Sequence, residues 1–141
     1  MSVPADVRET RERIVREHME AENDLDLARA LDTFGHPRYE LIATGEVYDG
    51  PEEVERYYRE SRAAFPDQRN EIISLRHAED AVIVEFWLLG THKGPLGRLP
   101  PTGREFRCRM TAFFIFEGTD LICERVYFDS ATIRHQLNGA S

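Results

Sequence analysis

The residue best placed to do chemistry is Asp129, within the segment LICERVYFDSATIRHQL at residues 121–137. The apolar residues before it are typical of a strand end, and SATIRHQL is typical of a short helix. An aspartate at this junction either caps the helix, a role for which Ser130 competes, or points into a cavity. Burial in a cavity would raise its pKa above the usual ~3.9 and suit it to take and return a substrate proton. Spacing alone favours the cap.

Three further polar side chains are candidates. Arg125 shares a strand face with Asp129, where it could anchor a substrate carboxylate or keep Asp129 ionised; the alternative is a structural ion pair with an acid from the helices. His92 ends a long strand in GTHKG, where its usual pKa of ~6.5 suits acid/base work; the alternative is a rim histidine bonded to loop backbone. His18 lies on the apolar stripe of the first helix, where a core role competes with substrate binding.

Large apolar and aromatic residues could line the cavity that such an acid would need. The candidates for substrate binding are Phe86, Leu88, Met110, Phe114, Tyr39, Tyr57 and Tyr127. Ordinary core packing explains any one of them, but together they suit a small apolar ligand.

The spacing of the potential metal ligands does not indicate a local metal site. The five histidines form neither an HxH nor an HxxxH pair, and the sequence has no CxxC. A metal could be assembled only from distant residues. The loop GPLGRLPPTG lacks the phosphate-binding pattern GxxxxGK[ST]. We therefore expect neither a metal nor a cofactor.

Composition narrows the class of protein. A chain of 141 residues, 41% hydrophobic and 31% charged, fits one globular domain over residues 1–141. The net charge of −8 argues against nucleic acid and anionic membranes as partners. No apolar run approaches the ~18 residues that span a bilayer, and the start has no apolar signal segment. A cytoplasmic location is expected.

The elements indicate an α+β fold. Helical spacing runs from Val7 to Glu22, a second helix should begin at Asp24, and two short strands flank Gly45. Residues 49–65 form a third helix, with Pro51 in its first turn. The remaining candidates are strands at 68–78, 80–93, 104–116 and 121–129 and a helix at 130–137. Helices followed by an antiparallel meander predict a curved sheet with helices packed on it.

The turn EGTD fixes a register for the last two strands. If Phe116 faces Leu121, alternation predicts a shared face. That face carries Cys108, Met110, Ala112, Phe114, Cys123, Arg125, Tyr127 and Asp129. The two cysteines would then lie roughly 20 Å apart, which predicts free buried thiols. Both faces of the sheet are apolar, so we expect helices on one and a second subunit on the other, with Trp87 in a homodimer or larger homo-oligomer.

The segments DGPEEVERYY, AFPDQRNEI, FWLLGTHKG, LPPTGREF, VYFD and RHQL together resemble the SnoaL-like polyketide cyclases of the nuclear transport factor two-like superfamily. The resemblance runs from about Ile14 to Leu137. It implies a cone-shaped fold around a mostly apolar cavity and a reaction without metal or cofactor. It also implies that Asp129 is the general acid/base, which reverses the preference from spacing, and that Phe86 points inward.

Three functions remain open. The first is a cofactor-independent cyclase or isomerase that acts on a small apolar, polyketide-like carbonyl compound, with Asp129 and His92 catalytic. The second is a non-catalytic module that binds a hydrophobic ligand. The third is an epoxide hydrolase, which needs two acids and an arginine around a water; Asp129 and Arg125 would supply two of these three groups.

Overall fold

The computed structural model describes residues 3–139, so residues 1, 2, 140 and 141 of the expected domain lie outside the described residues. The helices are α1 (Ala5–Asn23), α2 (Leu27–Leu31), α3 (Pro51–Ala64) and α4 (Ser130–Leu137). The strands are β1 (Arg38–Leu41), β2 (Glu46–Asp49), β3 (Arg69–His77), β4 (Ala81–Thr91), β5 (Glu105–Glu117) and β6 (Asp120–Tyr127). The α+β class and the succession of elements agree with the sequence prediction.

The six strands form one curved, open sheet in the order β2-β1-β6-β5-β4-β3. The last four strands are the expected antiparallel meander, and β1 pairs antiparallel with β2. The expectation of a wholly antiparallel sheet is wrong at one place, because β1 runs parallel to β6. The strands β1 and β2 precede the meander in the sequence. The last strand of the meander, β6, lies beside β1 and runs in the same direction.

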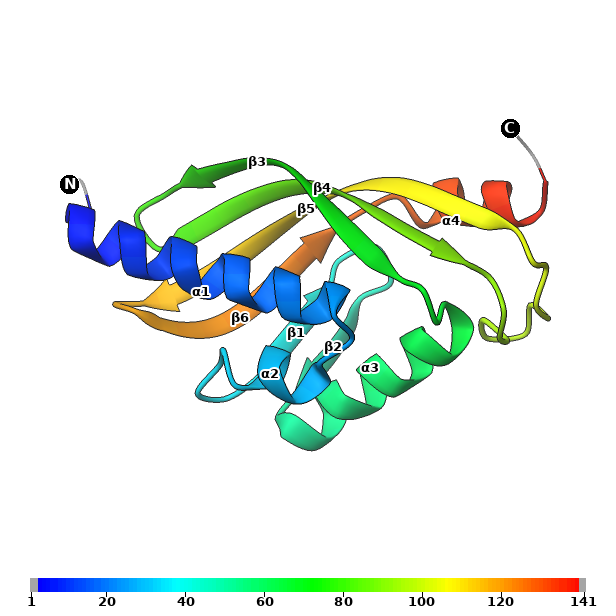
Figure 1. Ribbon diagram of the computed structural model, residues 1–141, viewed down its shortest axis with the longest axis horizontal. Coiled ribbons are helices and arrows are strands. Elements are labelled where there is room, and N and C mark those ends of the chain that lie inside the picture. Colours follow the sequence, from blue (N-terminus) through cyan, green and yellow to red (C-terminus); the bar gives the residue numbers. More distant parts are fainter. Residues whose placement is uncertain (1–2, 140–141) are drawn as a thin grey trace.

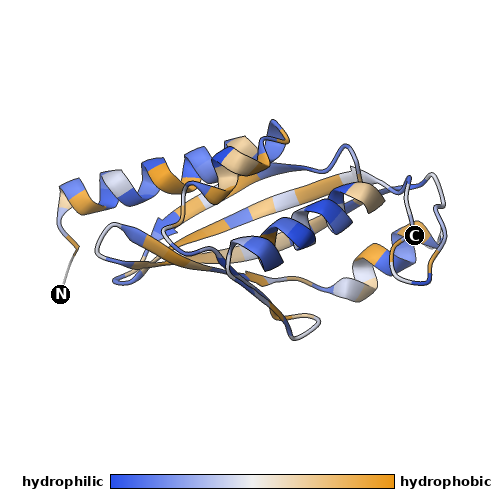
Figure 2. Cartoon of the chain, turned by 90° about the horizontal axis from the view of Figure 1, so that it is seen from below, coloured by the Kyte–Doolittle hydropathy of each residue, from blue (hydrophilic) through white to orange (hydrophobic). Residues whose placement is uncertain are grey.

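The helices α1, α2 and α3 lie on the concave side of this sheet, while α4 lies at one end (Figure 1). Val15 and Met19 of α1 and Val54 and Tyr58 of α3 belong to the main cluster of buried residues, together with the inward side chains of β4 and β5. Figure 2 shows hydrophobic and hydrophilic residues alternating along α1, whereas α3 is mostly hydrophilic. The hydrophobic core therefore fills the space between the helices and the sheet.

Two of the segments that carry the family resemblance, residues 64–72 and 86–94, contact each other or the end of α3. Asp67, which follows α3, accepts hydrogen bonds from the backbone amide and the hydroxyl of Thr91, both at 2.7 Å. A Cβ at Gly94 would lie 2.0 Å from the Ala63 carbonyl oxygen, so only glycine permits this approach of the strand end to α3. These contacts hold α3 against the end of β4.

A β-bulge changes the register of β5 and β6. Phe116 pairs with Leu121 as expected, but Ile115 pairs with Cys123, which leaves Ile122 as an extra residue. Beyond the bulge Phe114 pairs with Glu124 instead of Cys123. Because side chains alternate along a strand, this shift exchanges the two faces of β6. Both cysteines are buried and free, as predicted.

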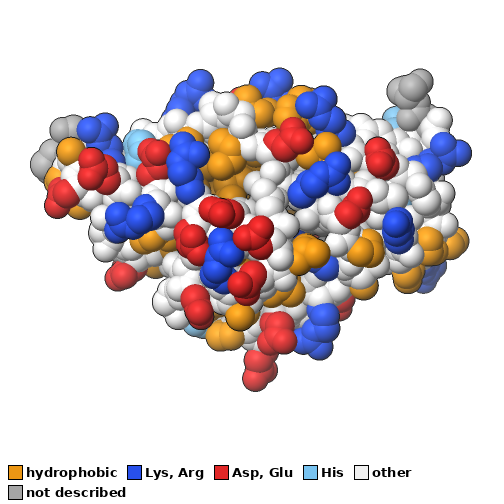
Figure 3. Space-filling view, in the orientation of Figure 1, with side chains coloured by type: hydrophobic (Ala, Val, Ile, Leu, Met, Phe, Trp, Pro, Cys, Tyr) orange, Lys and Arg blue, Asp and Glu red, His pale blue; other side chains and the backbone are white. Residues whose placement is uncertain are grey.

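On the face shown in Figure 3, acidic and basic side chains are interspersed, with no broad area of one sign. Within residues 3–139, no helix combines the length and apolar character needed to cross a membrane.

Candidate functional site

A cavity of about 40 Å³ lies between the helices and the inner face of the sheet. Its lining combines apolar side chains with acids, amides, tyrosines and two arginines. The lining residues are Met19, Glu22, Tyr39, Tyr57, Arg62, Gln68, Arg69, Asn70, Phe86, Leu88, Met110, Glu124 and Val126. Arg69 is exposed, so it marks the side on which the cavity meets solvent.

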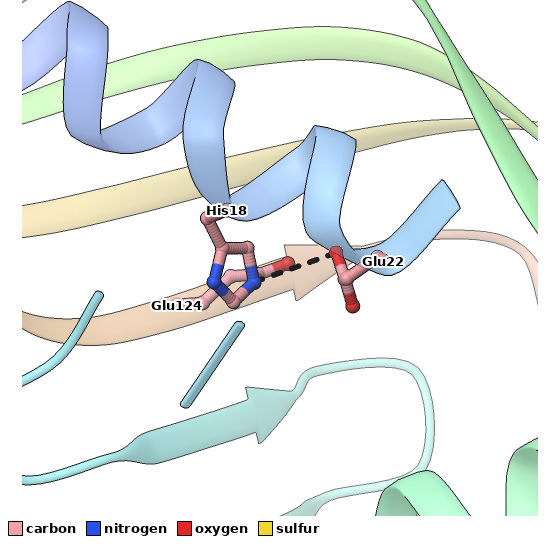
Figure 4. A group of neighbouring side chains, drawn as sticks. All are labelled: His18, Glu22 and Glu124. Atoms are coloured by element: carbon pink, nitrogen blue, oxygen red, sulfur yellow. Dashed lines mark ion pairs between the residues drawn. The ribbon is translucent and has the colours of Figure 1, made fainter. Parts of the chain in front are cut away.

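Two buried ionisable side chains, His18 and Glu124, meet the half-buried Glu22 beside this cavity (Figure 4). His18 and Glu22 are one helical turn apart on α1, so they project from the same face, and Glu124 projects toward them from β6. The His18 Nε2 atom lies 3.0 Å from Glu124 Oε1 and 3.4 Å from Glu22 Oε1. The Glu124 carboxylate reaches this position because the bulge at Ile122 turns it inward.

The hydrogen bonds of His18 fix its orientation. Thr33 donates its hydroxyl proton to the Ala30 carbonyl, so its oxygen accepts from His18 Nδ1 at 2.8 Å. On the other side of the ring, the Tyr39 hydroxyl lies 2.6 Å from Nε2. Burial lowers the pKa of His18, but Glu22 and Glu124 outweigh burial and raise it to about 10. The ring is therefore an imidazolium at neutral pH.

The two carboxylates differ in their pKa. Burial raises the pKa of Glu124, and the neighbouring Glu22 raises it further, against the opposing effect of His18. Burial also acts upward on the pKa of Glu22, but His18 and Arg62 outweigh it, so its pKa is lowered. Glu124 Oε1 is buried and makes no contact with hydrogen-bond geometry among the described residues, although it lies 3.0 Å from His18. The surroundings thus favour the ionised form of Glu22 and the protonated form of Glu124.

Tyrosines form the neighbouring wall. The hydroxyls of Tyr39 and Tyr58 are hydrogen-bonded to each other. Burial raises the pKa of both, and the carboxylates Glu124 and Glu22 raise it further. These phenols therefore stay protonated and can donate hydrogen bonds.

The same three residues are a possible set of metal ligands. His18 Nε2 and one oxygen each from Glu22 and Glu124 lie within 4.8 Å of one another, and imidazole and carboxylate ligands suit several divalent metals. A metal would have to displace the Nε2 proton, which both carboxylates stabilise. His18 and Glu22 belong to α1 and Glu124 belongs to β6, so no short sequence motif contains all three residues.

The structure brings five of the predicted binding residues into the cavity lining: Tyr39, Tyr57, Phe86, Leu88 and Met110. Phe86 points inward as the resemblance implied, and Glu85 and Trp87 lie on the opposite face of β4. Phe114 is fully buried against His18, with ring centroids 5.6 Å apart, and belongs to the core behind the cavity.

The expectation that Asp129 lies in the cavity is wrong. Asp129 is exposed and caps α4, accepting hydrogen bonds from the Ala131 amide and the Thr132 hydroxyl, both at 3.0 Å. The position that spacing alone favoured is the one observed.

Arg125 and Tyr127 are also outside the cavity, because the bulge places them on the outer face. Arg125 donates to Glu40 at 2.6 Å, so it is in a structural ion pair, but the partner lies on β1 and not on a helix as the alternative expected. The side chain of Tyr127 is 41% exposed and packs edge-on against Phe113.

His92 is fully buried but lies at the rim, away from the cavity lining. The Thr102 amide donates to His92 Nδ1 at 3.2 Å, and the Thr102 hydroxyl lies 3.0 Å from the same atom. The imidazole thereby joins GTHKG to PPTG across the loop between β4 and β5.

Sequence reasoning missed Glu22, Glu124 and Arg62 as site residues. One signal was present, since Glu22 follows His18 by four residues on the same helical stripe. A histidine and a glutamate on an apolar stripe indicate a paired buried charge.

Comparison with known proteins agrees with this architecture. The family model described as SnoaL-like polyketide cyclase matches residues 12–137. No curated protein matches this sequence.

Solved structures of similar fold include two described as proposed polyketide cyclases and one described as a proposed hydroxylase. A proposed polyketide cyclase from Acidithiobacillus ferrooxidans has a TM-score of 0.73 and 24% identity, covering 100% of each chain. IdmH of Streptomyces antibioticus, also a proposed polyketide cyclase, has a TM-score of 0.74 and 22% identity, covering 90% of this chain and 97% of its own.

AclR of Streptomyces galilaeus, a proposed hydroxylase, has a TM-score of 0.77 and 18% identity, covering 92% of this chain and 81% of its own. At these identities the neighbours establish the fold and leave the chemistry open. The family match, which spans nearly the whole chain, shows that this protein belongs to the SnoaL-like polyketide cyclase family.

Proposed function

We propose that this protein is a cofactor-independent cyclase or isomerase that works by acid/base catalysis on a small carbonyl compound. One observation carries the proposal: a buried carboxylate, Glu124, lines the cavity, and its Oε1 has no partner of hydrogen-bond geometry among residues 3–139 but lies 3.0 Å from His18, which also pairs with Glu22 at 3.4 Å. Pairs of titratable groups with pKa values moved in opposite directions are typical of acid/base sites.

Glu124 is the acid/base in this proposal. Its raised pKa brings it nearer neutral pH, where it can take a proton from carbon and return it to oxygen. His18 and Glu22 are positioning residues: the imidazolium limits how far the pKa of Glu124 rises, and Glu22 holds the imidazolium in place.

The proton transfers balance within the cavity. Glu124 takes a proton from the carbon next to a substrate carbonyl, and the resulting enolate oxygen accepts a hydrogen bond from Tyr39, which lines the cavity. In a cyclisation, the enolate carbon attacks a second carbonyl of the same molecule, and the new alkoxide takes the proton from Glu124. In an isomerisation, the proton returns to another carbon. Neither path needs an oxidant or a reductant.

The apolar part of the lining supports a substrate with a hydrocarbon body. Phe86, Met110 and Val126 lie on the sheet side of the cavity, close to Glu124 along the sheet. Apolar walls exclude water and strengthen the electrostatic interactions of the enolate.

Epoxide hydrolysis is a second candidate, favoured by the presence of two acids and an arginine, Glu22, Glu124 and Arg62, around one cavity. Glu22, with its lowered pKa, would take a proton from the attacking water. Glu124, with its raised pKa, would protonate the opening epoxide oxygen. A C–O bond to water forms while the epoxide C–O bond breaks, and the protons balance.

The test compares Glu124→Gln with Asp129→Asn, because both remove one carboxylate charge and only one acts on the cavity. Conversion of a β,γ-unsaturated cyclohexenone to its conjugated isomer is followed by ultraviolet absorbance. We expect Glu124→Gln to lower kcat/KM roughly 10²–10⁴-fold and Asp129→Asn to leave it within about twofold.

Two results would contradict the proposal: Glu124→Gln as active as the wild type, or a wild type that neither isomerises the enone nor exchanges α-protons of β-diketones in deuterated water. Binding of the ketones without turnover would identify a ligand-binding module instead. Diol formation from styrene oxide, with the new oxygen derived from labelled water, would favour the epoxide hydrolase.

A further inference from the structure

Arg62 is a buried cation whose hydrogen bonds are incomplete. It lies in the last turn of α3, lines the cavity, and has a side chain only 12% exposed. Its Nη1 donates to Ser61 Oγ at 2.9 Å, and its guanidinium lies 5.1 Å from the Tyr58 ring centroid. Its Nη2 makes a long contact of 3.4 Å with Glu22 Oε2. Among residues 3–139, nothing accepts a hydrogen bond from its buried Nε.

The two nitrogens of Arg62 with weak or missing hydrogen bonds, Nε and Nη2, are on the same edge of the guanidinium. Nε and Nη2 present parallel N–H groups, and this edge matches the two oxygens of a carboxylate. A buried N–H without an acceptor is unfavourable, so an acceptor supplied by a ligand would complete the site. Lysine could supply the charge but not the paired geometry.

The charge of the cluster agrees with an anionic ligand. Glu22 is shared between two basic side chains, at 3.4 Å from both His18 Nε2 and Arg62 Nη2, and His18 also has Glu124 at 3.0 Å. Among the described residues, Arg62 therefore has no carboxylate of its own. Arg69 adds a second guanidinium at the mouth, where its ion pair with Asp67 is 3.6 Å long.

We propose that this cavity takes a ligand that carries a carboxylate, and that the Nε and Nη2 edge of Arg62 binds it. The inference rests on the proposed function in taking the cavity as the substrate site, and it specifies the class of substrate as an acidic carbonyl compound. A volume of about 40 Å³ has room for a group of carboxylate size. The body of a larger acid must displace side chains at the mouth.

Matched acids and amides separate charge recognition from shape. Benzoate is compared with benzamide, and naphthoate with naphthamide, by isothermal titration calorimetry against the wild type, Arg62→Gln and Arg62→Lys. The control variant is Arg59→Gln, because Arg59 is on the same helix but 70% exposed and pairs only with Glu55 among the described residues. Circular dichroism confirms that each variant is folded.

We expect the wild type to bind each acid at least about tenfold more tightly than its amide. Arg62→Gln should lose this preference and leave amide binding within about twofold, while Arg62→Lys keeps part of it and Arg59→Gln all of it. Equal affinity for acid and amide, no saturable binding of either acid, or an unchanged preference in folded Arg62→Gln would overturn the inference. If the wild type shows no preference for acids but keeps turnover that depends on Glu124, the proposed function is supported and carboxylate binding by Arg62 is rejected. If the wild type binds carboxylates but shows no turnover, carboxylate binding is supported and the proposed function is rejected.

Discussion

Glu124 and Asp129 are carboxylates five residues apart in the same segment, yet their environments are opposite. Glu124 is 5% exposed and lies beside His18 in the cavity, whereas Asp129 is exposed and caps α4. The difference comes from one extra residue, Ile122, which shifts the register of β6 against β5. The position of a carboxylate along a strand therefore says little about its chemistry until the register is known.

A second pair sharpens the contrast. His18 and His92 are both fully buried, but His18 lies between two carboxylates and His92 bonds a loop threonine. Burial alone therefore does not distinguish a functional histidine from a structural one. The charged neighbours of His18 make the difference.

The largest effect on stability is expected for His18→Gln. This variant removes the cation between two buried carboxylates and leaves them facing each other, which costs about 3–5 kcal/mol. His92→Gln, at an equally buried site, loses neutral hydrogen bonds and should cost about 1–3 kcal/mol. Urea denaturation at neutral pH measures both. A larger loss for His92→Gln than for His18→Gln would show that the buried ion cluster does not stabilise the fold.

The second effect is a dependence of stability on pH. His18 has a pKa of about 10 in the folded chain, against a usual 6.5, so the folded state binds more protons between these values. The free energy of unfolding that this proton supplies is fully present below about pH 6.5 and is lost as the pH rises through about 10. Urea denaturation between about pH 6 and 9 should show this decline.

Glu124 acts in the same direction over a lower range. Because its pKa is raised in the folded chain, its contribution also falls as the pH rises above about 4.5, whereas Glu22, with a lowered pKa, contributes stability that is lost as the pH falls below that value. His18→Gln should flatten the decline above about pH 6.5. An unchanged slope in this variant would assign the decline to other groups.

A smaller effect is expected for Asp129→Ala. Loss of the helix cap should reduce stability by about 1 kcal/mol, because the Ala131 amide loses its acceptor. The thermal midpoint should fall by a few degrees, and Asp129→Ser, which can still cap, should recover most of this. Failure of serine to rescue the midpoint would argue against a capping role.

The smallest effect is expected for Arg125→Gln. Arg125 pairs with Glu40 at 2.6 Å, but its side chain is 37% exposed, so solvent weakens the pair and the expected cost is within about 1 kcal/mol. The variant should keep the turnover of the wild type in the enone assay. A marked loss of activity would return Arg125 to the list of site residues.

Most of the fold follows from local patterns in the sequence. Pro51 with the acids behind it marks the start of α3, and the apolar periodicity of SATIRHQL matches α4 residue for residue. The turn EGTD correctly pairs Phe116 with Leu121. Each of these signals involves residues that are close together in the sequence, so it can be recognised without knowledge of the folded structure.

The site could not be placed in the same way. Leu121, Ile122 and Cys123 are all apolar, so alternation carries no phase through them and cannot reveal the bulge. A charged residue in a strand is ordinarily predicted to face solvent, so the sequence alone does not predict that Glu124 is buried. The burial of Glu124 becomes favourable because its carboxylate lies 3.0 Å from His18, and His18 belongs to a helix more than a hundred residues earlier in the sequence.

The central claim is that His18 is a buried imidazolium held between Glu22 and Glu124 beside the cavity. Heteronuclear NMR of the imidazole nitrogens measures its protonation directly over a pH titration. We expect both His18 nitrogens to stay protonated well above pH 8, with deprotonation of the ring near pH 10. In Glu124→Gln the transition should move to lower pH. A His18 that loses its proton near the usual value of about 6.5 would contradict the account.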